Sequence, residues 1–399
     1  MTTQNLRVNH DTKNPPVTSA PLLDVGRGNR PLKDEIMEAV SDIIDSGWFI
    51  GGPHVKQLED TVAEVCQTEF AVGCASGSDA ILLALMAAGI KPGDEVICPS
   101  FTFFATASAI HRLGGKPVFI DIEPTSFNLD VSQIESLVTP KTKAIIPVHL
   151  FGQCADMDPI MEIARQHNLA VIEDCAQSIG ATESDRPAGS MGTVGCFSFY
   201  PTKNLGGFGD GGILTTNDPE VADRLRLLAN HGMRPRYYHQ EVGINSRLDA
   251  IQAAVLNAKM KHLSDYSENR KRNASRYRRM IVESGLAGMV SAPSTLPRCG
   301  HVWNQFTIRI PGGRRDEIRQ KLAEMNVGSE IYYPVPLHQQ ECFAYLSDET
   351  CGLPETDCAS NEVLSLPIFP ELTEQEQRYV VDCLAKALGT EQSVLRMTG

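Results

Sequence analysis

The chain has 399 residues, 42% of them hydrophobic, and a formal net charge of −13 at pH 7. This length is sufficient for two packed domains, and the acidic balance disfavours nucleic acid as a partner because a phosphate backbone requires a dense basic surface. No apolar run approaches the roughly 20 residues of a membrane-spanning helix, and the N-terminal segment lacks the apolar core of a signal peptide. We therefore expect a cytoplasmic protein with no membrane partner. The eleven cysteines include no CxxC pair, which predicts free thiols in a reducing compartment.

Residues 1–29 predict a polar N-terminal arm, and residues 30–262 a large domain. In that domain, short apolar runs alternate with helix-length segments, which is typical of an α/β fold with a mostly parallel, buried sheet. The expected strands lie in FAVGCA, EVICPS, KPVFIDI, AIIPVHL, AVIEDCA, GCFSFY and GGILTT. In such folds, function gathers in the loops at strand ends.

Residues 248–281 predict one long helix or two joined helices, with a basic second half that is more typical of a solvated face than of a nucleic-acid site. Residues 263–399 predict a smaller α+β domain. Its expected strands lie in VWNQFTIRI and GSEIYYPVPL, and its expected helices in RRDEIRQKLAEMN and TEQEQRYVVDCLAKAL.

Two strand-end motifs carry polar candidates. In EDCAQSIGA, Asp174 and Gln177 follow an apolar run. A carboxylate there is costly to desolvate without a cationic partner, although a turn or capping role would explain Asp174 alone. In CASGSDAILLAL, Gly77 and Ser78 begin an apolar helix, where backbone N–H groups can bind a phosphate. Ordinary capping accounts for the same residues.

Two further motifs add an aromatic ring and a lysine. Phe103, in SFTFFATASAI, can stack on a flat ring or pack in the core. SFYPTKNLGGFGDGG holds Ser198 and Lys203 among small and aromatic residues. Lysines usually lie at the surface, but a desolvated lysine becomes a neutral amine that can form a Schiff base with an aldehyde. Together, the four motifs supply what pyridoxal phosphate requires.

At these residues the chain resembles the DegT/DnrJ/EryC1/StrS family of sugar aminotransferases. The resemblance runs from about Leu22 to Leu388, through SGSDAILLAL, VIEDCAQSIGA, SFYPTKNLGGFGDGG and GINSRLDAIQAAVL. It implies the aspartate-aminotransferase fold, fold type I of the pyridoxal phosphate enzymes, with a seven-stranded, mostly parallel sheet. It also implies a homodimer with active sites at the subunit boundary.

The resemblance assigns roles to individual residues. Lys203 would form the Schiff base, Asp174 would face the pyridine nitrogen, and Gln177 would lie near the phenolic oxygen of the ring. The other assigned residues would hold the phosphate (Gly77, Ser78, Ser198 and, from the other subunit, Asn245), stack on the ring (Phe103) or contact the substrate (Arg247, Tyr333, Tyr332, Arg236, His239). Relatives often carry His where this chain has Tyr332.

The substrates implied are L-glutamate as amino donor and a nucleotide-linked keto sugar as acceptor, in surface polysaccharide or glycan biosynthesis. The segment NHGMRPRYYHQEVGINSRLDAIQAAVL is most similar to members that aminate the 3-keto position of a UDP-linked N-acetylated hexuronic acid. Its side chains Arg234, Arg236, Tyr237 and His239 would contact a carboxylate or diphosphate, or form a solvated loop. Amination at C4 of a UDP-, GDP- or dTDP-linked keto-deoxysugar is the alternative.

Three rival functions remain. Some relatives are sugar dehydratases with histidine at the lysine position, which Lys203 opposes. A non-catalytic regulatory or binding protein on the same fold would have no need of Lys203 or Asp174, yet both are present. For metal-dependent hydrolysis, the ten histidines form no HExxH motif or paired Cys/His spacing, so no metal site is expected.

Overall fold

A seven-stranded sheet organises the computed structural model, which describes residues 17–346 and 352–390. Its strands are β1 (Phe70–Cys74), β2 (Glu95–Pro99), β3 (Lys116–Ile120), β4 (Thr142–Ile145), β5 (Ala170–Asp174), β8 (Val194–Ser198) and β9 (Gly212–Thr216). The spatial order is β1-β9-β8-β5-β4-β2-β3, and β9 runs antiparallel to both of its neighbours while the other pairs are parallel. The predicted mostly parallel sheet is confirmed, and each strand overlaps a predicted segment, although β4 begins two residues and β8 one residue before the segment predicted for it.

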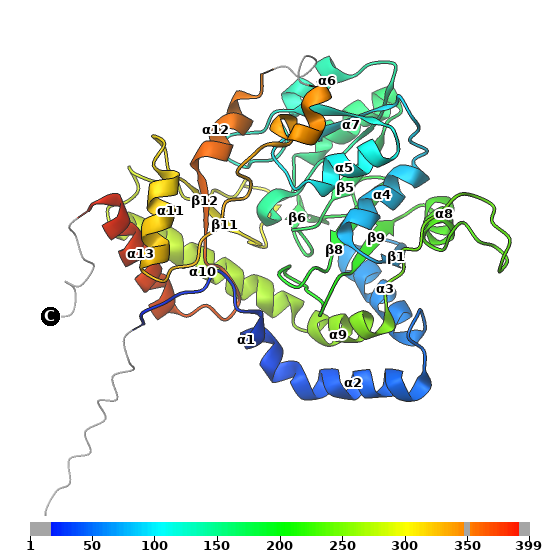
Figure 1. Ribbon diagram of the computed structural model, residues 1–399, viewed down its shortest axis with the longest axis horizontal. Helices are drawn as coiled ribbons and strands as arrows, with labels where there is room; N and C mark the ends of the chain where they lie inside the picture. Colours follow the sequence, from blue (N-terminus) through cyan, green and yellow to red (C-terminus); the bar gives the residue numbers. More distant parts are fainter. Residues whose placement is uncertain (1–16, 347–351, 391–399) are drawn as a thin grey trace, which may run out of the picture.

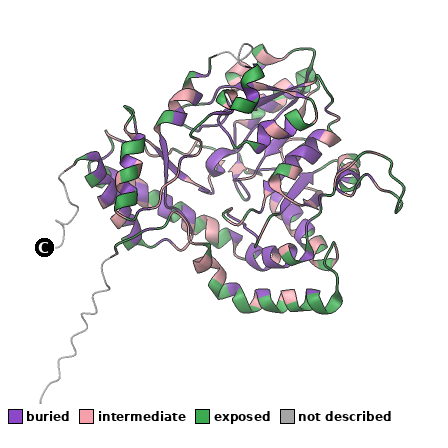
Figure 2. Cartoon of the chain, viewed as in Figure 1, coloured by how far each residue is buried: buried purple, intermediate pink, exposed green. Residues whose placement is uncertain are grey.

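Helices cover both faces of this sheet (Figure 1). They are α3 (Pro53–Cys66), α4 (Gly77–Ala87), α5 (Ala105–Arg112), α6 (Ile134–Leu137), α7 (Met157–His167), α8 (Pro219–Ala229) and α9 (Ala250–Met260). Successive side chains of a strand point to opposite faces. Accordingly, Val96 and Cys98 pack in one core with α4, whereas Ile97 between them packs in another with α7. Burial on both faces explains why these strands read as continuous apolar runs, and Figure 2 shows the sheet as largely buried.

A second core surrounds the antiparallel pair β11 (Phe306–Arg309) and β12 (Val363–Leu366). Around it pack α10 (Leu263–Glu283), α11 (Arg315–Glu324), α12 (Pro354–Glu362) and α13 (Glu374–Leu388). Both helices predicted here are confirmed. The strand predicted over GSEIYYPVPL is wrong: only Glu330 makes an isolated bridge, to Ser365. Two prolines in the segment explain this, because proline cannot donate to a ladder.

The helical segment predicted over 248–281 consists of two helices, α9 and α10. Its basic half is not uniformly solvated, because Arg270 is buried and donates to the backbone oxygens of Trp303, Asn304 and Ile368. A guanidinium group has five N–H donors, so one arginine can join three carbonyls from two distant segments. The basic run therefore contributes to packing as well as to the surface.

The remaining elements are short or N-terminal. They are α1 (Val25–Asn29), α2 (Lys33–Ser46), β6 (Thr182–Glu183), β7 (Arg186–Pro187), β10 (Cys299–Gly300) and five 3-10 turns. Most of the predicted N-terminal arm, residues 1–16, lies outside the described residues, and the domain division at about residue 262 stays a prediction. The ten cysteines that the structure describes are all free, as predicted. Within the described ranges, no helix combines the length and apolar character needed to cross a bilayer.

Candidate active site

Asp174 is the last residue of β5 and is buried. Its Oδ2 accepts a hydrogen bond from Thr106 Oγ1 (2.9 Å), and its Oδ1 accepts one from the backbone N–H of Ala176 (3.1 Å). Burial raises the pKa of this carboxyl, while the two donors and the charge of Lys203 oppose that rise. A carboxylate offers about four acceptor positions. Asp174 therefore retains capacity to accept a further N–H from a ligand.

Lys203 lies on the loop between β8 and β9, where its backbone N–H donates to Tyr200 O (2.9 Å). The loop is tight: a Cβ on Gly206 would lie 2.4 Å from Pro201 O. Burial of the Lys203 amino group lowers its pKa from 10.5 to about 8, against the attraction of Asp174. A neutral amine is therefore accessible near neutral pH, which is the state that a nucleophilic lysine needs.

The N-terminus of α4 lies against the end of β8. Ser76 caps the helix by accepting from Asp79 N (3.1 Å). A Cβ on Gly77 would lie only 2.6 Å from Ser198 Cβ, so glycine allows this approach. The helix start offers unpaired N–H groups and the positive end of its dipole, next to the hydroxyl of Ser198 and the exposed Ser78. These residues form a suitable anion site.

Aromatic side chains border the same region. Phe103 follows β2 and is 57% exposed, with its ring centroid 6.3 Å from that of Tyr333. Core packing, the commoner fate of a phenylalanine, therefore does not apply to Phe103. Gln177 Oε1 accepts from Phe151 N (2.6 Å), and its Nε2 donates to Tyr333 Oη (3.4 Å). Burial raises the pKa values of Tyr333 and of the adjacent Tyr332.

Four further predicted residues lie on the segment 230–247 between α8 and α9. The four are Arg236, His239, Asn245 and Arg247, and all are exposed. Figure 1 shows the segment projecting from the body of the molecule beyond α8. The side chains of Arg247 and His239 make local contacts: Arg247 Nε donates to Asn245 Oδ1 (3.1 Å), and His239 Nδ1 donates to His231 O (2.9 Å). The end of the segment reaches the candidate site, because the buried Ser246 accepts from Ala75 N (3.1 Å), just before α4.

Two arginines of this segment differ in how free their guanidinium groups are to bind an anionic ligand. Arg234 is held by both carboxylate oxygens of Asp223, each at 2.7 Å, so it is occupied within the chain. The guanidinium of Arg236 lies over the ring of Tyr237, with its carbon 4.9 Å from the ring centroid. Such stacking leaves the N–H groups of an arginine able to bind an anion. Arg236 is therefore the better candidate of the two.

Sequence reasoning missed Thr106, Glu173 and His149. Thr106 contacts Asp174 across 68 positions of sequence, and its only signal is its place four residues after Thr102, near the start of α5. Glu173 stands inside the apolar run AVIED with no exposed surface, and it pairs with the equally buried His149. A charged residue within a buried strand is the signal that points to Glu173.

Comparison with known proteins yields curated relatives along most of the chain. A protein from Geobacillus stearothermophilus named "Pleiotropic regulatory protein" is 48% identical, over 92% of this chain and 98% of its own length. The UDP-N-acetyl-3-dehydro-alpha-D-glucosamine 3-aminotransferase of Acidithiobacillus ferrooxidans is 44% identical, over 93% and 98%. The UDP-2-acetamido-2-deoxy-3-oxo-D-glucuronate aminotransferase of Pseudomonas aeruginosa is 40% identical, over 88% and 95%. Other relatives are named as a dTDP-3-amino-3,4,6-trideoxy-alpha-D-glucose transaminase and a GDP-perosamine synthase.

Solved structures agree with these relatives. The crystal structure of Streptomyces venezuelae DesV in complex with a ketimine intermediate matches with a TM-score of 0.88 at 40% identity, covering 94% of this chain and all of that one. The structure of ntda from Bacillus subtilis with bound cofactor pmp matches with a TM-score of 0.88 at 33% identity, covering 94% and 86%. The predicted fold type I architecture is confirmed.

The family assignment rests on nearly the whole chain. The sequence profile of the DegT/DnrJ/EryC1/StrS aminotransferase family matches residues 31–385. This range includes the strand ends that hold Asp174, Ser198 and Lys203, as well as the second core. The protein belongs to the DegT/DnrJ/EryC1/StrS aminotransferase family.

Proposed function

We propose that this protein binds pyridoxal phosphate and transfers the amino group of L-glutamate to a nucleotide-linked keto sugar. The acceptor that we favour is the 3-keto position of a UDP-linked N-acetylated hexuronic acid, in the synthesis of a surface polysaccharide or glycan. The observation that carries the proposal is Lys203, whose pKa of about 8 reflects burial beside the carboxylate of Asp174.

The donor set fits pyridoxal phosphate. Gly77 forms a cradle that a Cβ would fill, between the start of α4 and Ser198, and this cradle suits the phosphate. Asp174 keeps unused acceptor positions for a pyridine N–H, and the exposed ring of Phe103 offers a stacking surface. Gln177, whose amide contacts Phe151 N and Tyr333 Oη, would lie near the phenolic oxygen of the ring. When bound, the cofactor supplies an aldehyde for the amino group and a ring that accepts electrons.

In this reading, Lys203 is both nucleophile and proton carrier. Its neutral Nζ would hold the aldehyde of the bound cofactor, and, once the amino donor has released it, the same amine would take up the proton of the donor's α-carbon. The pKa of about 8 suits both tasks, because a general base works best when its pKa is near the operating pH. The tight loop from Tyr200 to Gly206 fixes where Nζ can reach.

Asp174 would hold the pyridine nitrogen of the bound cofactor in its protonated form. An ionised carboxylate in a buried site favours the protonated partner strongly, since opposite charges attract more in a low dielectric. The Thr106 hydroxyl and the Ala176 N–H favour the ionised state of Asp174. The carboxylate would thus help to keep the ring of the bound cofactor electron-poor.

The acceptor sugar is inferred from the relatives and from the free cation of the projecting segment. Two relatives are named for 3-oxo derivatives of UDP-linked N-acetylated sugars, one with a neutral and one with a uronic acid ring. Arg236 and Arg247 would meet the diphosphate or the C6 carboxylate, while Tyr332 and Tyr333 would line the sugar. C4 amination of a dTDP- or GDP-linked deoxysugar is the alternative.

The site would be shared between two subunits. Trp48, Phe49 and Ile50 are each about half exposed, and Phe49 O accepts from the N–H of Ala250, at the start of α9. Clustered exposed apolar side chains favour a protein partner. The neighbouring segment 230–247 would then reach the other subunit with Asn245, next to the phosphate.

Mixed dimers test this sharing. Lys203→Ala and Asn245→Asp are each expected to inactivate a homodimer, the second through repulsion of the phosphate. If Asn245 acts in the partner's site, equal mixing restores one intact site in each heterodimer, or about a quarter of wild-type activity. If it acts in its own subunit's site, no activity returns, and the shared site is wrong.

A regulatory protein is the second candidate, favoured by the name of the relative at 48% identity. A pure binding protein has no need for a lysine whose amino group is buried at an energetic cost beside a buried carboxylate. The two roles also do not exclude each other. Activity with a keto sugar decides whether catalysis is present.

The deciding experiment supplies the purified protein and pyridoxal phosphate with 15N-labelled L-glutamate and a panel of keto sugars. The panel holds the UDP-linked 3-keto forms of N-acetylglucosamine and N-acetylglucosaminuronic acid, and a dTDP-linked 4-keto deoxysugar. We expect the mass of the uronic acid product to carry the label. Labelling of the neutral or the dTDP-linked sugar alone would replace the favoured acceptor, and no labelled product would contradict the proposed transfer.

A further inference from the structure

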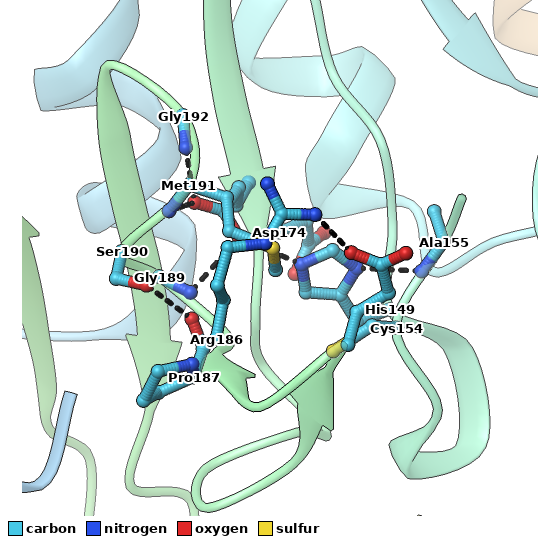
Figure 3. A network of polar contacts seen from close by, with 12 residues as sticks. His149, Cys154, Ala155, Asp174, Arg186, Pro187, Gly189, Ser190, Met191 and Gly192 are labelled. Atoms are coloured by element: carbon cyan, nitrogen blue, oxygen red, sulfur yellow. Dashed lines mark hydrogen bonds and ion pairs between the residues drawn. The ribbon is translucent and has the colours of Figure 1, made fainter. Parts of the chain in front are cut away.

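Two neighbouring acidic residues end β5 and face opposite sides of the sheet. Asp174 faces the candidate site. Glu173 is sealed in the interior, where Oε2 accepts from Gly189 N (2.9 Å) and Oε1 accepts from Met191 N (2.8 Å) and Gly192 N (2.6 Å). Figure 3 shows Gly189, Met191 and Gly192 on one loop, with dashed lines marking hydrogen bonds between the residues drawn. Glu173 thus binds the loop 189–192 to the end of β5.

His149 supplies the fourth donor to Glu173, through Nε2 to Oε2 (2.9 Å). The other ring nitrogen, Nδ1, accepts from the backbone N–H of Ala155 (3.1 Å). Since that N–H can only donate, Nδ1 carries no proton, and the ring is the neutral tautomer with its proton on Nε2. His149, Glu173 and Cys175 have the proximity of a metal site, but these hydrogen bonds already occupy the carboxylate and Nδ1.

The backbone of Asp174 is held by the segment that carries His149. His149 N donates to Asp174 O (3.0 Å), and Asp174 N donates to Pro147 O (2.9 Å). The backbone of His149 is thus bonded to Asp174, and Glu173 is the residue directly before Asp174. The hydrogen bond between the side chains of His149 and Glu173 therefore links the two residues a second time. Rotation or sliding of this strand end would break several buried hydrogen bonds together, which is costly.

Thr106 holds the carboxylate itself. It is fully buried in the first turn of α5 and donates to Asp174 Oδ2 (2.9 Å). Its oxygen lies 3.4 Å from Thr102 Oγ1, and since Thr106 gives its proton to a carboxylate, Thr102 is the donor in that contact. Oδ1 is meanwhile fixed by Ala176 N. Both oxygens of Asp174 are thus oriented before any ligand binds.

We propose that Thr106 and the His149–Glu173 pair are positioning residues that fix the carboxylate of Asp174 for a pyridine nitrogen. None of the three touches the reacting atoms. All three act through Asp174: Thr106 holds its side chain, and the His149–Glu173 pair holds its backbone. This inference rests on the proposed pyridoxal phosphate chemistry.

Thr106→Val tests the first part, because valine keeps the shape and removes the donor, while Thr106→Ser keeps the hydroxyl. We expect the valine variant to lose about ten-fold in kcat, the scale of one hydrogen bond to a charge, with little change in KM for L-glutamate. The pH titration of the bound cofactor's absorption should shift, and serine should restore it. A valine variant with the wild-type titration and kcat would overturn this part.

The His149 pair tests the second part. His149→Asn keeps an acceptor for Ala155 N and removes the donor to Glu173, whereas His149→Gln keeps a donor at the Nε2 position. We expect the asparagine variant to shift the cofactor titration and weaken cofactor binding, and the glutamine variant to do so less. Lower melting temperatures of the cofactor-free variants with unchanged titrations would show a purely structural pair and overturn the positioning role.

Failure of the two proposals can be told apart. If the wild-type protein binds no pyridoxal phosphate, the proposed function is wrong, and the positioning role is wrong with it. If the wild type binds the cofactor and reacts with L-glutamate while the valine and asparagine variants behave like it, only the positioning role is wrong.

Discussion

The Lys203–Asp174 region and the segment 230–247 are built in opposite ways. In the first, strand ends and helix starts bring side chains from distant parts of the sequence into buried contact, as between Thr106 and Asp174. In the second, exposed side chains contact near neighbours, as Arg234 does Asp223 and Arg247 does Asn245. The residues proposed for the chemistry are thus held by contacts within the chain, whereas the side chains proposed for substrate choice are exposed.

This difference separates two kinds of experimental effect. Burial shifts the pKa values of Lys203 and Asp174, so changes there should reduce the rate for every substrate. Changes at the exposed side chains of residues 234–239 should alter the affinity for the sugar and leave the reaction with the amino donor intact. Four predictions test this separation.

Lys203→Ala should have the largest effect, a loss of at least about 1,000-fold in kcat, because it removes both the nucleophile and the proton carrier. Steady-state turnover measures it. Lys259→Ala is an informative comparison, since burial also lowers the pKa of Lys259 to about 8 while its Nζ donates to Gly206 O at 2.5 Å. If the Lys203 and Lys259 variants lost the same amount of kcat and bound the cofactor covalently to the same extent, the role of Lys203 would be contradicted.

Asp174→Asn should lower kcat by about 100-fold, since the neutral amide no longer stabilises a protonated pyridine. Half-reaction rates with L-glutamate, followed by absorbance, measure the loss. Asp265→Asn, on the exposed start of α10, is the matched control and should match wild type. An active Asp174→Asn protein would remove the carboxylate from the mechanism.

Covalent capture of pyridoxal phosphate by the cofactor-free protein should depend on pH through Lys203. Its pKa of about 8 lies below the ordinary 10.5, so the amine is protonated below pH 8 and neutral above it. The capture rate should rise about ten-fold per pH unit below pH 8 and level off above it. Stopped-flow absorbance measures this, and a rate that keeps rising to pH 10 would show an unperturbed lysine.

Arg236→Ala should have the smallest effect, a rise of about three- to ten-fold in KM for the nucleotide sugar, as expected for one exposed contact to an anion. The half-reaction with L-glutamate should not change. Arg234→Ala is the control, because its guanidinium is already bound to Asp223. A slower half-reaction with L-glutamate in the Arg236 variant would contradict the claim that this residue affects only the binding of the sugar.

The sequence allowed prediction of all seven strands of the large sheet because burial on both faces makes each one a continuous apolar run. It did not allow prediction of the path of GSEIYYPVPL, whose β-branched and aromatic residues suit a strand while Pro334 and Pro336 prevent a ladder. The burial of Arg270 was also not predicted. Its guanidinium binds the carbonyl oxygens of Trp303 and Ile368, and only the tertiary fold brings these residues near it.

The candidate site shows the same limit. Asp174 and Ser198 stand at strand ends, and Gly77 and Lys203 follow strand ends within five residues. The topology of an α/β sheet brings such positions to one edge. Thr106, His149 and Glu173 act through side-chain hydrogen bonds whose partners depend on strand register and helix rotation. No local pattern encodes such pairings, so only the structure reveals them.

The most direct test of the central claim is the absorption spectrum of the protein with pyridoxal phosphate before and after L-glutamate, with Lys203→Ala beside it. The account predicts a visible band of lysine-bound cofactor that L-glutamate converts to the pyridoxamine form, with no lysine-bound band in the variant. A protein that forms no such band, or a variant that forms the same one, would contradict the assignment of Lys203.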